Sequence, residues 1–208
     1  MRLYLVRHGQ TDWNVSGKAQ GHTDIALNAE GRTQAQLLAR HLGELPIERI
    51  VCSDLLRCRE TLAPSLSTLR IEPEYRTDLR ERGFGDWEGN HFTEVHHHMN
   101  LISSTRDISL TAVRPPNGES FEDVWQRVSG LAEVLFETDA NVLVVSHGGT
   151  LGVLLARMLQ GGFETSRAFR FENTAITELK RRPEGQFMLI RYANTDHLMA
   201  EAALAEKA

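Results

Sequence analysis

The stretch LYLVRHG, residues 3–9, decides the fold, because an apolar run in it gives way abruptly to a basic, glycine-containing turn. Consecutive apolar residues that end in a polar turn are typical of a strand buried on both faces of a sheet. The apolar part is Leu3–Val6, and similar runs recur at Arg49–Cys52 and Val142–Val145. These runs predict buried strands that lie parallel to one another.

Each of these runs leads into a segment whose apolar residues have helical spacing. Asn28–Leu45 follows the first run, Leu55–Leu66 follows the second, and Thr150–Leu159 follows the third. Glu119–Phe136 carries a further apolar stripe at helical spacing. The repeated order of strand, loop and helix predicts an α/β fold, a three-layer sandwich whose mostly parallel central sheet has helices on both faces.

The remaining segments complete this architecture. Ala175–Lys180 and Phe187–Tyr192 flank a turn and predict a strand pair, while the Ala/Glu-rich Met199–Ala208 predicts a short helix or a frayed tail. No internal repeat or linker is found, so residues 1–208 are expected to form a single domain. The least regular part, residues 89–118, is the best candidate for a flap inserted over a site.

Composition excludes several classes of function. The 208 residues are 41% hydrophobic and 25% charged, as in an ordinary soluble globular protein. A net charge of −5 argues against a nucleic acid or an anionic membrane as partner. The chain shows neither a signal peptide pattern nor an apolar stretch of ~18 residues, so we expect a cytoplasmic protein. Cys52 and Cys58 are too few for a disulfide framework or a four-thiolate metal site.

Basic and imidazole side chains follow the predicted strands closely. Arg7 and His8 come directly after the first strand, Arg57 shortly after the second, and His147 directly after the third. Because the carboxyl ends of parallel strands meet at one edge of a sheet, these side chains are expected on one rim. Guanidinium groups match phosphate oxygens in pairs, and a glycine such as Gly148 lets the backbone approach an anion. The pattern predicts a phosphate pocket that needs no metal.

Six motifs, spread over most of the chain, carry a family resemblance. They are LVRHGQTDWN at residues 5–14, QGHTD at 20–24, SDLLRCRET at 53–61, LRERGFGDWEG at 79–89, PNGES at 116–120 and VSHGGT at 145–150. In this order they resemble the histidine phosphatase superfamily, in its phosphoglycerate-mutase-like branch. Within that branch the chain is similar to small alpha-ribazole phosphatases and broad-specificity phosphatases.

The resemblance implies roles for the residues that match by position. His8 is implied to be the nucleophile that takes the phosphoryl group, and Glu81 the proton donor. The residues implied to line the phosphate site are Arg7, Asn14, Gln20, Gly21, Arg57, His147 and Gly148, of which Arg7, Arg57 and His147 also count as catalytic. The resemblance implies neither a cofactor nor a metal.

The expected activity is the hydrolysis of small phosphorylated metabolites through a phosphohistidine intermediate. The alternative is a phosphoglycerate mutase, but the family's mutases are generally longer between the acid motif and the second histidine. Here 65 positions separate Glu81 from His147, which leaves room for only a modest flap. A non-catalytic binding protein on the same fold is less favoured, because none of the five catalytic residues is missing. The identity of the substrate stays open, and the sequence allows a homodimer.

Two further clusters have plainer interpretations. The run His96-His97-His98 is expected to be solvated or to line the flap, because consecutive helical residues point in different directions and do not converge on one metal ion. Arg80 and Arg82 flank the predicted acid and are candidates to meet a carboxylate or phosphate of the substrate.

Overall fold

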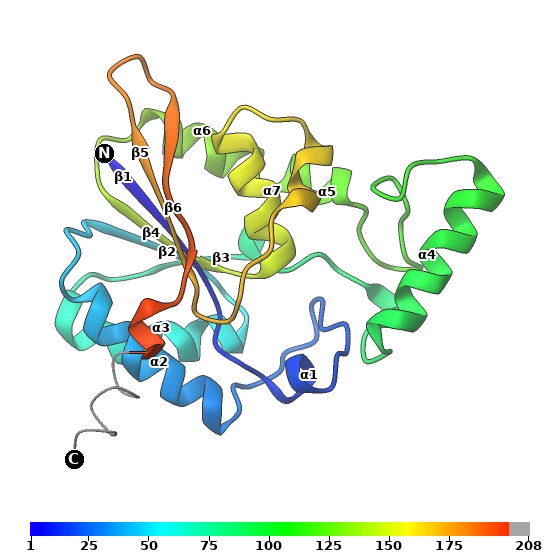
Figure 1. Cartoon of the computed structure of the whole chain (residues 1–208), viewed down its shortest axis with the longest axis horizontal. Coiled ribbons are helices and arrows are strands. Elements are labelled where there is room, and N and C mark those ends of the chain that lie inside the picture. Colours follow the sequence, from blue (N-terminus) through cyan, green and yellow to red (C-terminus); the bar gives the residue numbers. More distant parts are fainter. Residues whose placement is uncertain (200–208) are drawn as a thin grey trace.

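A six-stranded sheet runs through the computed structural model, which describes residues 1–199 (Figure 1). The strands are β1 (Arg2–Arg7), β2 (Arg49–Ser53), β3 (Glu74–Arg76), β4 (Val142–Ser146), β5 (Ile176–Arg181) and β6 (Phe187–Asn194). Their order is β3-β2-β4-β1-β5-β6; the first four are mutually parallel, whereas β5 and β6 run antiparallel to their neighbours. The sheet is therefore mixed but mostly parallel.

Helices cover both faces of this sheet. The helices are α1 (Asp12–Val15), α2 (Ala29–Leu42), α3 (Leu56–Leu69), α4 (Phe92–Arg106), α5 (Phe121–Arg127), α6 (Ser129–Glu137), α7 (Gly148–Met158) and α8 (Asp196–Met199), with 3₁₀ turns η1 (Thr77–Leu79), η2 (Gly85–Trp87) and η3 (Phe163–Ala168). In Figure 1, α2 and α3 lie on one side of the strands and α6 and α7 on the other. The predicted α/β sandwich of three layers is confirmed.

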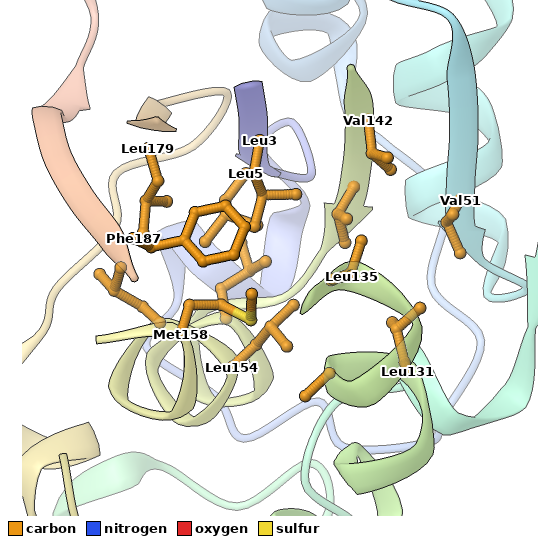
Figure 2. Close-up of a cluster of buried hydrophobic side chains, with 14 of the residues drawn as sticks. Leu3, Leu5, Val51, Leu131, Leu135, Val142, Leu154, Met158, Leu179 and Phe187 are labelled. Atoms are coloured by element: carbon orange, nitrogen blue, oxygen red, sulfur yellow. The ribbon is translucent and has the colours of Figure 1, made fainter. Parts of the chain in front are cut away.

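The side chains of β1 alternate between two hydrophobic cores. Tyr4 and Val6 pack with residues of α2 and α3, whereas Leu3 and Leu5 pack with residues of α6 and α7. Figure 2 shows the second core, in which Leu135 of α6 and Leu154 of α7 lie against the sheet. Because a strand points successive side chains to opposite faces, the apolar stretch Leu3–Val6 of β1 packs against both helical layers.

Most predicted elements are found, but the predicted helix over Glu119–Phe136 is wrong as a single helix. It is divided into α5 and α6, with Val128 between them. Near the break, the carbonyl of Trp125 accepts side-chain hydrogen bonds from Ser129 (2.9 Å) and Arg157 (3.2 Å). Such bonds compete with the helical ladder and bend helices. The edge strand β3 was not predicted, because it has only three residues and none of them is buried.

Residues 89–118, which we call the flap segment, are more regular than the sequence indicated. Half of the segment is α4, a 15-residue helix that stands to one side of the sheet (Figure 1). Only Val95 and Met99 of α4 are buried, which is why its sequence shows no clear apolar stripe. They pack in a small core of their own with Ala19, Phe84, Trp87 and Val113.

At the C-terminus, Met199 ends α8, and the rest of the predicted tail over Met199–Ala208 lies outside the described residues. Among residues 1–199, none of the helices combines the length and the apolar character that crossing a bilayer requires.

The turn after β1 is fastened to α2 and α3. The Gly9 amide donates to Thr61 Oγ1 (2.8 Å), and the Gln10 amide donates to Gln34 Oε1 (3.0 Å). The backbone of α2 comes so close that a Cβ on Gly31 would lie 2.1 Å from the Gln10 carbonyl oxygen. Only a glycine at position 31 permits this approach.

We expect Gly31→Ala to lower the free energy of unfolding by ~1–3 kcal/mol, because the added methyl must push the Gln10 backbone away. Gly130→Ala is the control, since nothing lies within 4 Å of a Cβ on this helical glycine. The control is expected to be neutral or stabilising, because alanine forms helices better than glycine. Urea denaturation of both variants checks the expectation, and equal midpoints would contradict it.

Candidate active site

Three strand ends bring basic and imidazole side chains together. Arg7 ends β1 and pairs with Ser146, the last residue of β4. One residue further, the amide of His8 donates to the Ser146 carbonyl (2.9 Å). The rings of His8 and His147 consequently lie with their centroids 5.1 Å apart. Arg57, in the first turn of α3, contacts His147, so the predicted convergence on one rim is observed.

The imidazole of His8 is held in one tautomer. It is 3% exposed, and its Nδ1 lies 2.7 Å from the Gly9 carbonyl oxygen. A carbonyl only accepts hydrogen bonds, so Nδ1 must carry the proton and Nε2 keeps its lone pair. Burial lowers the pKa of His8 well below its ordinary value, and the charges of Arg57 and Arg7 lower it further. His8 is therefore a neutral base with a defined free nitrogen.

Arg57 is completely buried and bound on three sides. Its Nε donates to His147 Nδ1 (3.1 Å), and its terminal nitrogens donate to the carbonyls of Thr23 (3.0 Å) and Gly21 (2.8 Å). Because His147 Nδ1 accepts, its Nε2 carries the proton and donates to Ser53 Oγ (2.8 Å). Burial, followed by the charge of Arg57, lowers the pKa of His147 well below its ordinary value. A guanidinium has five N–H donors, so two of those on Arg57 remain for an anion.

Arg7 has donors to spare as well. One terminal nitrogen donates to the Phe171 carbonyl (2.6 Å), while Nε is buried and has no partner among the described residues. A Cβ on Gly148 would lie 3.7 Å from this Nε. An unpaired N–H on a buried cation is costly unless a ligand satisfies it.

Asn14, Gln20 and Gly21, which the family resemblance implies at the phosphate site, make different contacts. Asn14 Oδ1 accepts from the amide and hydroxyl of Thr11 (both 3.0 Å), which caps α1. Gln20 is buried, and its Oε1 has no partner among residues 1–199. Gly21 uses its carbonyl to hold Arg57, so the contact it makes in the structure is to the arginine.

Glu81 reaches the same site from the loop after η1. Its carboxylate accepts hydrogen bonds from the backbone amides of Gly149 (3.1 Å), Thr150 (3.1 Å) and Arg82 (2.9 Å). Two of these donors belong to the first turn of α7, where unsatisfied amides and the helix dipole attract a negative group. The N-terminus of α7 thus positions the Glu81 carboxylate next to Gly149 and Thr150.

A network that sequence reasoning missed holds the backbone around Glu81. Arg127 donates to the carbonyls of Asp78 (2.7 Å), Arg80 (3.0 Å) and Glu81 (3.2 Å) and forms an ion pair with Glu119 (2.8 Å). His22 Nε2 lies 2.9 Å from the Glu81 carbonyl oxygen and 3.5 Å from Glu119 Oε2. Glu119 belongs to the PNGES motif and His22 to the QGHTD motif, but no local pattern of residues indicates that they hold the Glu81 backbone.

Charge in this network is well compensated. Burial alone would raise the pKa of Glu119, but hydrogen bonds with His22, Arg127 and the Gly83 amide lower it to about 2. The hydrogen bond to Glu119 in turn raises the pKa of His22.

Asn173 is another residue not predicted from sequence. Its side-chain amide nitrogen donates to the His8 carbonyl (2.9 Å).

A cavity of about 500 Å³ opens beside the acid. Arg7, Glu81, Gly148 and Gly149 belong to or adjoin the strand-end site, and we call the part of the cavity that they line its inner end. The other lining residues come mainly from the flap segment, from η3 and from the loop that follows η3. His8, Arg57 and His147 are buried and are not among its lining residues. Along the chain, His8 follows Arg7 and His147 precedes Gly148.

Two sequence predictions about nearby clusters have clear outcomes. In the histidine run, His96 lines the cavity whereas His98 stacks on Trp87 (5.4 Å between centroids). Within residues 1–199, no group of three or more His, Cys, Asp or Glu side chains is arranged to hold a metal ion. Arg80 is taken up by an ion pair with Asp54, and Arg82 by the carbonyls of Glu119 (2.7 Å) and Val113 (2.9 Å).

Comparison with known proteins agrees with this geometry. The family model of the histidine phosphatase superfamily (branch 1) matches residues 3–195. The chain belongs to this superfamily. A probable phosphatase of Schizosaccharomyces pombe is 35% identical to this histidine phosphatase, with 97% of each chain covered.

Relatives of both expected kinds are found. The crystal structure of the alpha-ribazole phosphatase from Shigella flexneri has a TM-score of 0.82 and 31% identity, covering 93% of this chain and 96% of that one. A probable phosphoglycerate mutase of Shigella dysenteriae is 32% identical and covers 86% of this chain and 84% of its own. The fold and the phosphatase class expected from the sequence are thereby confirmed.

We expect Glu119→Gln to destabilise the protein by about 2 kcal/mol, as when a charge-assisted hydrogen bond is lost. The stabilisation by ionised Glu119 is present above its ordinary pKa of 4.5 and is lost as the pH falls toward about 2. That by protonated His22 is complete below its ordinary pKa of 6.5 and is lost as the pH rises through the higher pKa of the folded state. The loss should therefore be greatest between about pH 4.5 and 6.5.

Chemical denaturation at several pH values measures this difference. Glu44→Gln, at an exposed position, is the matched control and should leave the stability unchanged. A loss for Glu119→Gln that stays constant from pH 4 to pH 8 would contradict the coupling with His22.

Proposed function

We propose that this histidine phosphatase hydrolyses phosphomonoesters of small metabolites, with His8 as the nucleophile. The observation that carries the proposal is the state of the His8 ring. Its Nδ1 is bound to the Gly9 carbonyl, so the unprotonated Nε2 is available to attack phosphorus. Its lowered pKa keeps the ring neutral at physiological pH.

In the first step, Nε2 of His8 forms a bond to phosphorus while the bond from phosphorus to the ester oxygen breaks. The imidazole becomes positively charged, because Nδ1 keeps its proton. The Gly9 carbonyl at 2.7 Å is already placed to stabilise that charge. No reorganisation is needed at this position when the charge develops.

The negative charge of the transferring phosphoryl group needs cationic donors. Arg7 has an unpaired Nε, and Arg57 keeps two N–H groups beyond those bound to His147, Gly21 and Thr23. Such fixed donors stabilise the transition state without a metal. In the proposed site His147 acts mainly by orienting Arg57, because both of its ring nitrogens have protein partners.

Glu81 supplies the proton that the leaving alkoxide requires. In the first step its carboxylic acid protonates the departing oxygen, and the carboxylate that results then takes a proton from water. That water attacks phosphorus, the bond from phosphorus to Nε2 breaks, and inorganic phosphate leaves. The amides of Gly149 and Thr150 hold the Glu81 carboxyl group in place in both steps.

The name of the Shigella flexneri relative suggests one substrate, alpha-ribazole phosphate. The second candidate function is that of a phosphoglycerate mutase, which the Shigella dysenteriae relative favours. In a mutase the phosphohistidine returns its phosphoryl group to another hydroxyl. Interconversion of 3- and 2-phosphoglycerate without release of inorganic phosphate would establish the mutase and overturn the hydrolase.

His8→Ala is expected to abolish both phosphate release and covalent labelling by a ³²P-labelled phosphomonoester, because no other side chain at the site replaces Nε2. The exposed His97 provides the control, and His97→Ala should keep normal turnover. Rapid-quench labelling together with a phosphate assay makes the measurement. Hydrolysis by His8→Ala at a rate near that of the wild type would rule out the assigned nucleophile.

Glu81→Gln should slow alkyl phosphates ~10²-fold or more, because an alkoxide needs its proton from a general acid. Aryl phosphates with acidic phenols should lose much less, since their leaving groups depart unprotonated. The ratio of kcat values for phenethyl phosphate and 4-nitrophenyl phosphate isolates the effect. Equal losses on both esters would argue against Glu81 as the acid.

A further inference from the structure

The cavity beside Glu81 has two chemically different parts. Its inner end holds Arg7, Glu81 and the two glycines of α7, which suits a phosphoryl group. Beyond them the walls are formed mainly by apolar side chains from three parts of the chain. These are Phe84, Phe92, Val95, Met99, Leu110, Phe121, Phe169 and Phe171. A leaving group that occupies this region is surrounded by aromatic rings and aliphatic chains.

Four arginines line the cavity against two glutamates, in a protein whose net charge is −5. Arg7 belongs to the phosphoryl end. The guanidinium of Arg82 is already occupied by protein contacts. It donates to the carbonyls of Glu119 and Val113 and lies over the ring of Phe121 (4.5 Å). Arg167 and Arg170 remain, both exposed, and neither side chain has an ion pair or hydrogen bond among residues 1–199.

The backbone that carries these two arginines is firmly held. The hydroxyl of Tyr192 on β6 bonds both the amide and the carbonyl of Arg170. On the other side, η3 packs so closely on α7 that a Cβ on Gly152 would lie 2.9 Å from the Ser166 carbonyl oxygen. The backbone under both guanidinium groups is therefore fixed before a ligand binds, which reduces the conformational entropy lost on binding.

One carboxylate lies in the same outer region. Glu164 is three residues before Arg167, and its Oε1 accepts hydrogen bonds from the hydroxyls of Ser109 (3.0 Å) and Thr111. These bonds tie η3 to the flap segment and engage the charge of Glu164. An anion at the cavity mouth would thus meet Arg167 and Arg170, which have no ion pair among residues 1–199. The nearby Glu164 carboxylate already accepts hydrogen bonds from two hydroxyls.

We propose that the leaving group of the substrate combines an apolar body with a second anionic group, which Arg167 and Arg170 bind at the mouth of the cavity. The inference rests on the proposed phosphatase activity and specifies its substrate class. The second group is a carboxylate or a phosphoryl group, since both match guanidinium donors in pairs. Arg167 and Arg170 then determine specificity, whereas His8, Arg7, Arg57 and Glu81 carry out the chemistry.

The test uses straight-chain phosphomonoesters of three to eight carbons. Each is made in four forms, with a methyl, a carboxylate, a non-hydrolysable phosphonate or a trimethylammonium group at the far end. With the wild type, kcat/KM for methyl-ended esters should rise ~2–4-fold per added CH₂ as the apolar walls become covered. At the best length, the carboxylate or the phosphonate form should exceed the methyl form by about tenfold. The cationic form should fall below it.

The double variant Arg167→Gln/Arg170→Gln should reduce the preference for the anionic end to less than about twofold. Its kcat/KM for the methyl-ended ester should stay near the wild-type value, and its thermal melting should be unchanged. Arg106→Gln is the control, because Arg106 is an exposed arginine of α4 that does not line the cavity. It should keep the full preference.

Comparing kcat/KM for the carboxylate-ended and the phosphonate-ended esters identifies which anion is recognised. Turnover of the methyl-ended esters without any preference for an anionic end would overturn the inference and leave the phosphatase intact. A preference that survives in the double variant would overturn it as well. Absence of phosphate release from every ester would instead contradict the proposed function, and the inference with it.

Discussion

The parallel pairing of β1 with β4 is the constraint on which the rest of the structure depends. The register places Arg7 beside Ser146, and the next hydrogen bond joins the His8 amide to the Ser146 carbonyl. Because β1 is also the strand whose side chains enter both hydrophobic cores, its position is set by burial on two faces at once. A one-residue shift of β1 would exchange its two faces and separate the two imidazoles.

The site at this edge of the sheet contains an arginine, Arg57, that is shielded from water. Arg57 is completely buried, and its desolvation is offset by the carbonyls of Gly21 and Thr23 and by a neutral imidazole. Burial and the neighbouring arginines keep both histidines uncharged. The local excess of positive charge is thus carried by arginines alone, which suits a dianionic ligand and leaves the lone pair of His8 Nε2 available for the proposed attack on phosphorus.

Much of this was predictable from the sequence, since its determinants are local. The apolar runs of β1, β2 and β4 mark buried strands, and chain order alone puts Arg7, His8 and His147 at their ends. The sequence did not reveal α4, because only two of its residues are buried, or the break at Val128, which depends on a side chain from α7. The sequence also did not reveal the hydrogen bonds that side chains donate to backbone carbonyls far away in the chain. These are the bonds of Arg127, His22 and Asn173, and the bond from Arg57 to the Gly21 carbonyl.

The small core under α4 has a consequence for how this enzyme can diverge. Val95 and Met99 pack with Phe84, Trp87 and their neighbours, apart from the two cores that flank the sheet. Substitutions on the cavity face of α4 therefore leave the packing that aligns the strand ends untouched. The residues proposed for phosphoryl transfer and the α4 wall of the cavity thus rest on different hydrophobic cores, so substitutions in α4 can change the substrate range without changing the residues proposed for the chemistry.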